Sequence, residues 1–404
     1  MNPLQGKEVV LGVTGSIAAF KAADLASKLV QAGAGVSVVM TQSAREFVTP
    51  FTFRSITGRP ALYDMWSPQN DSAEEHVALA RRADVIVIAP CSANTLAKLA
   101  HGFADDMVAL AVLATKAPVL VAPAMDAQLW ANVATQANVA TLRDRGVAFV
   151  GPATGRLASG HSGVGRLEEP GTIVGAVQHL LARDGDLAGR RIVVSAGGTR
   201  EPIDPVRFIT NKSSGKMGFA LAEAARDRGA AVTLVSTTTA LPVPYGVDLV
   251  EAETVAQLRE AVLAACTGAD ALIMAAAPAD FRVATVAGQK IKKGDGGLTL
   301  DLVKNEDFSL EVPDTLVKVG FAAETEDLEA NALKKLQEKR FDLICANDVT
   351  AKDAGFGVDT NRVTILDRHG GREELPLMPK YDVADRILDR VVSLLAKRPS
   401  RTAG

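Results

Sequence analysis

The residues of this chain that are best suited to chemistry form a short polar run, NKSSGK, at positions 211–216, directly before an apolar helical pattern. Amide, hydroxyl and ammonium groups beside the free N–H groups of a helix N-terminus bind anions, above all phosphates. The spacings GxGxxG and GxxxxGK[ST] are absent here, which argues against a nicotinamide dinucleotide site and against a Walker-type site. The run therefore predicts a phosphate site of another kind.

A basic loop, QKIKK at positions 289–293, lies between Gly288 and Gly294. Three neighbouring lysines are commonly a solvated surface run. A flexible, glycine-flanked lysine loop can instead close over phosphates as a lid. The residues alone leave both interpretations open.

The N-terminal half places small hydrogen-bonding residues after its expected strands, at Thr14-Gly15-Ser16, in the SANT run 92–95 and in the PAMD run 123–126. Helix N-termini attract phosphate, although the same residue types also cap helices. His76 is either an ordinary helix residue or a base. The run GRLASGHSGVGRL, positions 155–167, is too glycine-rich for regular structure and predicts a mobile flap that covers a ligand.

These residues must be positioned by short apolar runs that alternate with helical patterns, which is typical of βαβ units and a mostly parallel sheet. The expected strands are Glu8 to Val13, Val36 to Met40, Asp84 to Ala89, Pro118 to Ala122, Ile192 to Ala196, Ala231 to Ser236, Ala271 to Ala276, Leu343 to Ala346 and Val363 to Leu366. Ligands of open parallel sheets bind at the carboxyl ends of the strands, where the motifs lie.

The strand pattern restarts after a polar, glycine-containing stretch, Arg183 to Arg191, which we interpret as a linker. A chain of 404 residues has room for two domains of roughly 100 to 200 residues each. We therefore expect two α/β domains, residues 1–185 and 186–404, with the boundary near residue 186.

Composition argues against several classes of protein. A net charge of −3 gives no electrostatic reason to expect nucleic acid or an anionic membrane as partner, and 4% aromatic residues argue against base stacking. Cys91, Cys266 and Cys345 are too few and too far apart for a disulfide framework or a CxxC metal site. No apolar run reaches the ~18 residues of a membrane helix. We expect a cytoplasmic enzyme that acts on small molecules.

Four ordered motifs, GVTGSIAAFK, PxSANT, GxADD and PAMxxxxW, resemble the flavin-binding cysteine decarboxylase family from about residue 6 to residue 180. The resemblance implies a flavodoxin-like fold, with FMN bound between the subunits of a trimer, and a catalytic base at His76. Oxidation of the substrate's thiol side by FMN would supply the electron sink that direct loss of CO2 lacks. The implied FMN contacts are Gly15, Ser16, Ile17, Thr41, Ser92 and Asn94.

Two positions depart from that family's pattern. Asp126 stands where an asparagine usually meets the substrate's carboxylate, and a carboxylate there would repel it unless one of the two is protonated. Ser159 stands where many members carry a cysteine as acid, and a hydroxyl is a far poorer acid than a thiol. Three hypotheses follow: decarboxylation completed with another acid, His161 and Cys91 being nearest in sequence; a half-reaction that stalls before reduction; or flavin binding without useful turnover.

Six ordered motifs of the C-terminal half resemble the bacterial, CTP-using phosphopantothenate–cysteine ligases over residues 188 to 395. They are SAGGTREPIDPVRFITNKSSGK, MAAAPADF, QKIKK, LVKNED, GFAAET and ICANDV. The resemblance implies a Rossmann-like domain in which Asn211 and Lys290 act on an acyl-cytidylate and Asp280 meets Mg2+. The implied CTP pocket comprises Ala275, Ala276, Asp280, Lys290, Glu306, Asp307, Phe308, Ser309, Phe321, Lys335 and Lys339. Mg2+ and lysines would neutralise the departing pyrophosphate.

Together the halves resemble the bifunctional phosphopantothenoylcysteine decarboxylase / phosphopantothenate–cysteine ligases of coenzyme A biosynthesis. The implied reactions are consecutive: cysteine is joined to 4′-phosphopantothenate, and the product is decarboxylated to 4′-phosphopantetheine. Trimeric flavin domains joined by dimeric ligase domains imply a homo-oligomer, a dodecamer.

Three alternatives remain at this point: an active ligase with an impaired decarboxylase half, a flavin- and CTP-binding regulatory protein, and a nicotinamide-dependent reductase with two Rossmann units. The intact Asn211 and Lys290 argue against the regulatory protein, since sensing a nucleotide needs neither. The missing GxGxxG in both halves argues against the reductase.

Overall fold

The computed structural model describes residues 2–65, 75–293, 297–324, 328–348, 355 and 357–398, without the side chains of residues 75, 76, 324 and 348. Contacts divide the chain into an N-terminal unit, Asn2–Leu181, and a C-terminal unit, Ala182–Gly404. Among the described residues, none of the helices combines the length and apolar character needed to cross a bilayer.

The stretch that we interpreted as a linker is packed into the C-terminal unit. Leu187 is fully buried in the core of that unit. Asp186 beside it forms an ion pair with Arg228. The short 3-10 helix η2 (Ala182–Asp184) opens the unit. The stretch is therefore a structured start of the second unit and not a free tether.

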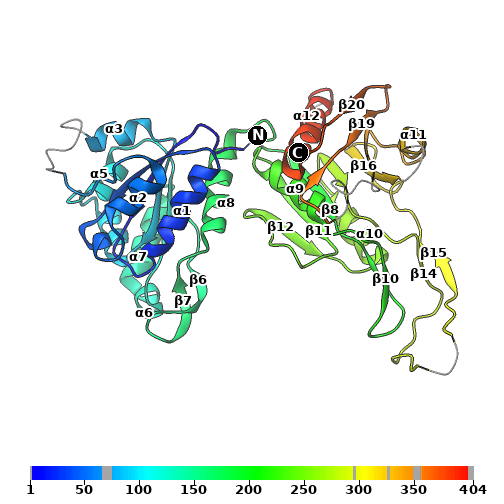
Figure 1. The fold of residues 1–404 in the computed structure, drawn as a ribbon, viewed down its shortest axis with the longest axis horizontal. Helices are drawn as coiled ribbons and strands as arrows, with labels where there is room; N and C mark the ends of the chain where they lie inside the picture. The colour runs from blue at the N-terminus through cyan, green and yellow to red at the C-terminus, as the bar shows by residue number, and fades with distance from the viewer. Residues whose placement is uncertain are drawn as a thin grey trace. The chain divides into compact units, whose positions relative to one another are not determined.

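The N-terminal unit is a three-layer α/β structure around a five-stranded sheet of order β2-β1-β3-β4-β5 with parallel pairings (Figure 1). This is the flavodoxin-like order. The strands are β1 (Glu8–Val13), β2 (Gly35–Met40), β3 (Val85–Cys91), β4 (Val119–Pro123) and β5 (Ala148–Phe149). The helices are α1 (Ala19–Gln31), η1 (Gln42–Glu46), α2 (Pro50–Thr57), α3 (Glu75–Arg82), α4 (Ala93–His101), α5 (Met107–Ala114), α6 (Ala127–Ala131), α7 (Val133–Asp144) and α8 (Pro170–Leu181).

Apolar side chains on both faces of this sheet explain why its strands are nearly continuous hydrophobic runs. On one face, Ile86, Ile88 and Val121 pack against residues of α4, α5 and α7. Helices α1 and α8 contact each other. Helix α1 also contacts β1 and β3, and α8 also contacts β3 and β4. Gly33 takes a φ of +90° just after α1, a conformation that favours glycine and ends the helix.

The glycine-rich run at 155–167 is a β-hairpin, so our expectation that it lacks regular structure was wrong. Strands β6 (Ala153–Arg156) and β7 (Ser162–Arg166) pair antiparallel. Its glycines allow the hairpin to approach the residues after β4 closely. A Cβ on Gly163 would lie 2.8 Å from the Cβ of Ala127, and one on Gly165 would lie 2.2 Å from the carbonyl oxygen of Met125. The hairpin is therefore seated against the loop that follows β4. We call residues 153–166 the flap and residues 157–161 its tip.

The C-terminal unit is built on an eight-stranded sheet of order β12-β11-β8-β13-β16-β17-β19-β20. Its first six strands repeat the Rossmann-like order 3-2-1-4-5-6 and are parallel, and β19 and β20 extend the sheet antiparallel. The strands are β8 (Arg191–Ala196), β11 (Ala231–Ser236), β12 (Val247–Glu251), β13 (Ala271–Met274), β16 (Val317–Glu324), β17 (Leu343–Asp348), β19 (Thr364–Asp367) and β20 (Arg372–Glu374). Two residues each form β18 (Thr360–Asn361) and β21 (Met378–Pro379).

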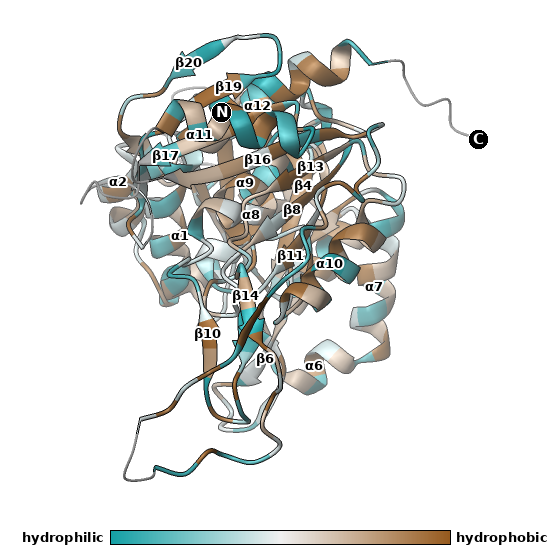
Figure 2. Ribbon diagram, turned by 90° about the vertical axis from the view of Figure 1, so that its right-hand side faces the viewer, coloured by the Kyte–Doolittle hydropathy of each residue, from teal (hydrophilic) through white to brown (hydrophobic). Residues whose placement is uncertain are grey.

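Four helices cover the two faces of this sheet. Helices α9 (Lys216–Arg226) and α12 (Lys380–Ala396) pack on the face that carries Ile192 and Val194. Helix α10 (Val255–Ala265) packs on the opposite face with Val193, and α11 (Leu328–Glu338) packs there beside β16 and β17. Figure 2 shows hydrophobic strands in β8 and β11 and mixed hydrophobic and hydrophilic residues along α10 and α12.

Two small hairpin-like pairs project from this sheet. Strand β9 (Arg200–Pro202) pairs with β10 (Phe208–Thr210), and β14 (Phe281–Val283) pairs with β15 (Leu302–Lys304). Figure 1 shows β10, β14 and β15 extending away from the strands of the sheet. We call these four strands and their connections the arm. Apolar side chains of the arm are exposed at Val206, Phe208, Phe281, Val286, Leu298 and Leu302.

Candidate active sites

The first candidate site lies at the carboxyl edge of the N-terminal sheet, where the strand order reverses between β1 and β3. Thr14, fully buried after β1, holds two loops together there. Its hydroxyl donates to the carbonyl oxygen of Pro90 at 2.7 Å and accepts the main-chain N–H of Ser92 at 3.0 Å. The Gly15-Ser16 turn and the SANT run, which are far apart in sequence, therefore lie side by side.

Two of the hydroxyls predicted to meet FMN, those of Thr41 and Ser92, also cap helices that start at this edge, and the hydroxyl of Ser16 accepts a hydrogen bond just before α1. Ser16 Oγ accepts the N–H of Ala18 at 3.3 Å, Ser92 Oγ accepts that of Thr95 at 3.3 Å, and Thr41 Oγ1 accepts that of Ala44 at 3.2 Å. Asn94 is exposed in the first turn of α4. The capping and anion-binding interpretations of these residues are thus compatible, since N–H groups and hydroxyls are gathered at one edge.

The turn at Gly15 has room for glycine alone. A Cβ at this position would lie 2.5 Å from the Cβ of Ser43, so any side chain would push the turn away from the loop after β2. Gly15 thereby brings the main chain close to the edge where Thr41 lies.

A cavity of about 630 Å³ opens between the start of α1 and the flap. From α1 it is lined by Ser16, Ile17, Phe20 and Lys21, and from the loop after β4 by Met125 and Asp126. The flap contributes Arg156 to Ser159, Gly165 and Arg166, and Leu167 follows directly after it. Of the residues predicted for FMN, Ser16 and Ile17 line this cavity, whereas Gly15, Thr41, Ser92 and Asn94 lie along the sheet edge.

The two residues that depart from the decarboxylase pattern meet in this cavity. Ser159 donates its hydroxyl hydrogen to Asp126 Oδ2 at 2.8 Å. The other carboxylate oxygen of Asp126 accepts the main-chain N–H of Gln128 at 3.0 Å. The Gln128 N–H first, then the Ser159 hydroxyl and the charge of His161, hold the pKa of Asp126 below its usual range. Asp126 is therefore an ionised carboxylate at neutral pH.

The two groups considered as replacement acids differ in their surroundings. Cys91 is fully buried at the end of β3, and this burial raises the pKa of its thiol far above the ordinary value. It does not line the cavity. His161 is exposed at the tip of the flap. The side chain of His76 lies outside the described residues, so its predicted role as base stays a prediction.

The second candidate site lies at the carboxyl edge of the C-terminal sheet, where the order reverses between β8 and β13. Two adjoining pockets share Ala276, Pro278, Phe321, Lys335 and Lys339. The two lysines come from α11 and its end, and Phe321 comes from β16. Strands that are distant in sequence thus build one continuous cleft.

The first of these pockets, about 160 Å³, holds most residues predicted for CTP. Asp280, Glu306, Asp307 and Phe308 line it together with the shared residues. Burial alone would raise the pKa of Asp307, but the Ser309 N–H and the Lys339 ammonium 2.9 Å away bring the pKa below its ordinary value. Ser309, also predicted, is fully buried and lines neither pocket.

The second pocket, about 230 Å³, brings the NKSSGK run to the cleft. Ser213, Ser214 and Lys216 line it at the start of α9, and Gly215, with a φ of +80°, caps that helix. Ala275 lies in its wall as predicted for the nucleotide. Hydroxyls, an ammonium group and the N-terminus of an eleven-residue helix thus face one hollow, which suits a phosphate chain.

Two polar residues of this pocket, Asn361 and Lys380, had no signal in the sequence, whereas a third, Asn347, belongs to the ICANDV motif. Lys380 is 6% exposed, and its ammonium donates to the carbonyl oxygens of Gly355 at 2.9 Å, Thr360 at 3.3 Å and Val358. Burial first, then the charge of Lys216, lowers the pKa of Lys380. A lysine at the start of a helix is an ordinary sequence feature, and it is the fold that buries this one.

Asn211 lies beside the cleft and not in its walls, and Lys290 lines neither pocket. The side-chain amide of Asn211 donates to the carbonyl oxygens of Ala277, at 3.3 Å, and Pro278, at 3.0 Å, which line the second pocket. The loop that carries Lys290 is anchored one residue later: Ile291 donates its N–H to Asp204 at 3.1 Å and accepts from Arg207 at 2.8 Å.

Asp204 and Arg207 are therefore positioning residues that sequence reasoning missed. Arg207 forms an ion pair with Asp204, and its hydrogen bonds are the main cause that lowers the pKa of Asp204. The motif IDPVRF contains both residues three positions apart, but its spacing does not reveal a partner more than eighty residues away.

Within the described residues, no three histidine, cysteine or carboxylate side chains are grouped as metal ligands. Asp280 is an exposed carboxylate that lines the first pocket together with Glu306 and Asp307. Magnesium ions are commonly held by one or two carboxylates together with substrate phosphates. The donor set present thus suits a metal that arrives with a nucleotide more than a resident metal.

Comparisons with known proteins match both units. The family "Flavoprotein" matches residues 2–182, and the family "DNA/pantothenate metabolism flavoprotein C-terminal domain" matches residues 187–395. The coenzyme A biosynthesis bifunctional protein CoaBC of Bacillus subtilis (strain 168) is 46% identical over 405 residues, which cover 99% of this chain and 100% of the relative. CoaBC of Mycobacterium tuberculosis (strain ATCC 25618 / H37Rv) is 44% identical over 409 residues, 96% of this chain and 97% of its own. A crystal structure of the C-terminal domain of a CoaBC protein shares 40% identity, with a TM-score of 0.46, over 52% of this chain and 98% of its own.

Proposed function

This chain belongs to the family of coenzyme A biosynthesis bifunctional proteins, and from that premise we propose that it catalyses two consecutive reactions. The C-terminal unit joins cysteine to 4′-phosphopantothenate at the expense of CTP. The N-terminal unit then decarboxylates 4′-phosphopantothenoylcysteine to 4′-phosphopantetheine with FMN. The observation that carries the proposal is the cleft whose two pockets share Phe321, Lys335 and Lys339, because a nucleotide needs adjoining places for a base and a phosphate chain.

In the ligase reaction, a carboxylate must be activated before an amine can attack it at neutral pH. We propose that the base of CTP binds between Phe308 and Phe321 and that its phosphates bind at Ser213, Ser214 and the start of α9. Lys335 and Lys339 border both pockets and would neutralise the charge of the departing pyrophosphate. Asp280 would hold Mg2+, which would help to neutralise the charge of the phosphates.

The carboxylate oxygen would attack the α-phosphorus of CTP, and pyrophosphate would leave. Two further residues are proposed to act on the acyl-cytidylate that results. Asn211, whose amide already reaches the wall of the second pocket, would hold the activated carbonyl in place. Lys290 would close over the cleft from its loop, which Asp204 and Arg207 anchor. Cysteine's amine then attacks the carbonyl carbon, the amide bond forms and CMP leaves.

In the decarboxylase reaction, bound FMN would supply reversible oxidation of the substrate's thiol side. The residues at the sheet edge fit this cofactor, because hydroxyls of Ser16, Thr41 and Ser92 and the N-termini of α1 and α4 converge at the switch point of a flavodoxin-like sheet. Ser16 and Ile17 would hold FMN toward the cavity, and Asn94 would meet it from α4. His76 is proposed as the base.

Assembly and location are parts of the same proposal. Ile17 and Phe20 are 58% and 61% exposed at the mouth of the first cavity, and the arm exposes a row of apolar side chains. Both surfaces support a homo-oligomer in which neighbouring copies cover them, and we propose a dodecamer in the cytoplasm. Native mass spectrometry would test this assembly through a mass twelve times that of one chain, and a monomer would contradict it.

The whole proposal is tested by mass spectrometry of the products formed by purified protein from 4′-phosphopantothenate, cysteine, CTP and Mg2+. We expect 4′-phosphopantetheine, CMP and pyrophosphate, a yellow protein, and loss of ligation when EDTA removes the metal. Formation of 4′-phosphopantothenoylcysteine and CMP alone would leave the ligase and refute the decarboxylase. Absence of both products would refute the assignment of the C-terminal unit.

A further inference from the structure

The N-terminal unit departs from the decarboxylase pattern at two positions, and the structure brings these two positions into contact. Asp126 caps α6 after β4, and Ser159 lies at the tip of the flap, 33 positions later in the chain. The hydroxyl of Ser159 donates to Asp126 Oδ2 at 2.8 Å. Because the two unusual residues meet as hydrogen-bond donor and acceptor, we regard them as one coupled replacement and not as two independent losses of catalytic groups.

The contact lies where it controls the flap. The base of the hairpin is held by the main chain, because Met125 donates its N–H to Gly165 at 2.9 Å and Gly163 lies against Ala127. The tip is a tight turn closed by its own main-chain bonds, Leu157 to His161 at 2.8 Å and Gly160 to Leu157 at 3.0 Å. In the described part of the chain, the tip makes a single hydrogen bond to another segment, the one from Ser159 to Asp126.

We infer that Asp126 and Ser159 form a coupled latch that holds the flap tip over the cavity, so that residue 126 of this chain positions the flap and does not receive the substrate's carboxylate. The inference rests on the proposed function of the N-terminal unit and adds a positioning role at the same site. An ionised carboxylate only accepts hydrogen bonds, so it needs a donor at the tip, and the serine hydroxyl provides one.

The chemistry of the pair explains why each departure requires the other. A thiol is a weaker hydrogen-bond donor than a hydroxyl, and a carboxylate beside it disfavours the thiolate. A cysteine at position 159 would therefore be a poor latch and a poor acid opposite Asp126. With an asparagine at position 126, by contrast, a cysteine at position 159 faces no negative charge. The family's usual pair and the pair found here are each consistent, whereas a cysteine at position 159 opposite Asp126 is not.

Hydrogen exchange of the full-length protein as purified tests the latch without any turnover. We compare S159A, D126A and the double variant D126A/S159A with two matched controls, S162A in β7 and D144A at the end of α7. Loss of one hydrogen bond at an exposed site should raise the exchange rates of the Leu157 and Gly160 amides, and trypsin cleavage after Arg156, by about fivefold. The double variant should be no faster than S159A. Rates equal to the controls, or effects that multiply, would overturn the latch.

Turnover provides a second, independent test of coupling. We expect the S159C variant to decarboxylate at least about tenfold more slowly than the D126N/S159C variant, since only the latter frees the thiol from a neighbouring carboxylate. Equal rates for the two variants would contradict the coupling. Flavin content and ligation rate, measured on the same preparations, show that each variant is folded. A wild-type protein without flavin or decarboxylation would refute the proposed function of the N-terminal unit, while the exchange rates would still decide the latch.

Discussion

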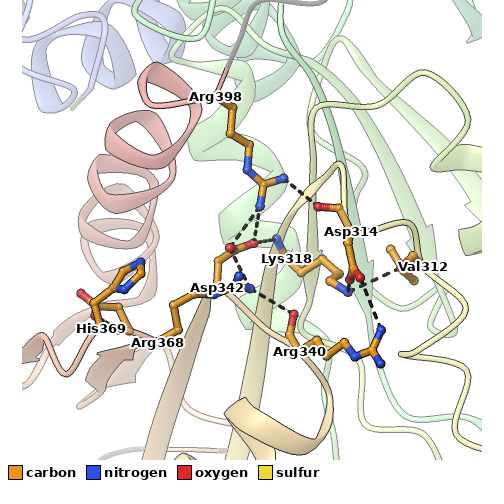
Figure 3. A network of polar contacts seen from close by, with 9 residues as sticks. Val312, Asp314, Lys318, Arg340, Asp342, Arg368, His369 and Arg398 are labelled. Atoms are coloured by element: carbon orange, nitrogen blue, oxygen red, sulfur yellow. Dashed lines mark hydrogen bonds and ion pairs between the residues drawn. The ribbon is translucent and has the colours of Figure 1, made fainter.

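Asp342 joins three segments of the C-terminal unit through one carboxylate, and its removal gives a prediction that the structure quantifies. The residue is 4% exposed at the start of β17. It accepts the main-chain N–H of Lys318 in β16 at 2.8 Å and pairs with Arg368 and Arg398, each at 2.9 Å (Figure 3). Arg368 follows β19 and Arg398 follows α12. The carboxylate therefore ties the amino ends of two central strands to the end of the last helix.

The D342A variant should lose about 2–3 kcal/mol of unfolding free energy. Hydrogen bonds to charged groups contribute about 1.5–3 kcal/mol each when buried. The side chains of Arg368 and Arg398 are 43% and 27% exposed, so water replaces part of the interaction that each arginine loses. The total loss of unfolding free energy therefore stays near the contribution of one buried hydrogen bond. For a unit of this size, about 2–4 °C is lost per kcal/mol, which gives a fall of about 4–12 °C in melting temperature.

Circular dichroism and tryptophan fluorescence together make the assay specific. Both tryptophans, Trp66 and Trp130, belong to the N-terminal unit, so fluorescence follows that unit while far-ultraviolet circular dichroism follows both. We expect D342A to lower a circular dichroism transition and to leave the fluorescence transition unchanged. The exposed edge-strand variant D248N serves as control. A shift no larger than that of D248N, or an equal shift in fluorescence, would refute the reasoning.

Three further predictions concern binding and pH. K339M, which removes an ammonium group shared by both pockets, should raise the KM for CTP about tenfold in ligation assays, whereas K334M on the exposed side of α11 should not; equal effects would contradict the placement of CTP. Burial raises the pKa of Asp227 to about 6 despite the arginine beside it, so the folded chain favours the protonated form, and stability should fall as pH rises from about 4 to about 6; chemical denaturation of D227N should show a flatter decline, and an unchanged slope would disprove this cause. R156Q, which removes a guanidinium group from the wall of the first cavity, should raise the KM for 4′-phosphopantothenoylcysteine several-fold, and the control R54Q should leave it unchanged.

The sequence predicted the strands that are continuous apolar runs and missed those that are not. All nine expected strands are present, with ends displaced by at most two residues. Strand β16 was missed although it lies in the centre of the sheet, because Lys318 interrupts its apolar run. That lysine is 1% exposed, and its ammonium reaches Asp314 at 2.6 Å and the carbonyl oxygen of Val312 at 3.5 Å. Strand β12 was missed because it is an edge strand whose last four residues are exposed.

The residues of the candidate sites also fall into those that the sequence could predict and those that it could not. Residues that belong to a contiguous motif, such as Ser16, Ser92 and Phe321, could be proposed because the motif reaches the carboxyl end of a strand as one piece. Residues whose role depends on a distant partner could not. Lys380 looks like any lysine at the start of a helix until the fold surrounds its ammonium with the carbonyl oxygens of Gly355, Val358 and Thr360.

Asp126 and Ser159 show what such distant partners change in an argument about function. Taken one at a time, each residue replaces a group that the decarboxylase chemistry uses, and each substitution suggests a loss of activity. Taken as a hydrogen-bonded pair, they define one alternative way to close the same cavity, with an acceptor on the sheet and a donor on the flap. A residue that departs from a motif near a catalytic centre therefore predicts lost activity only when its contacts in the folded structure are also unfavourable.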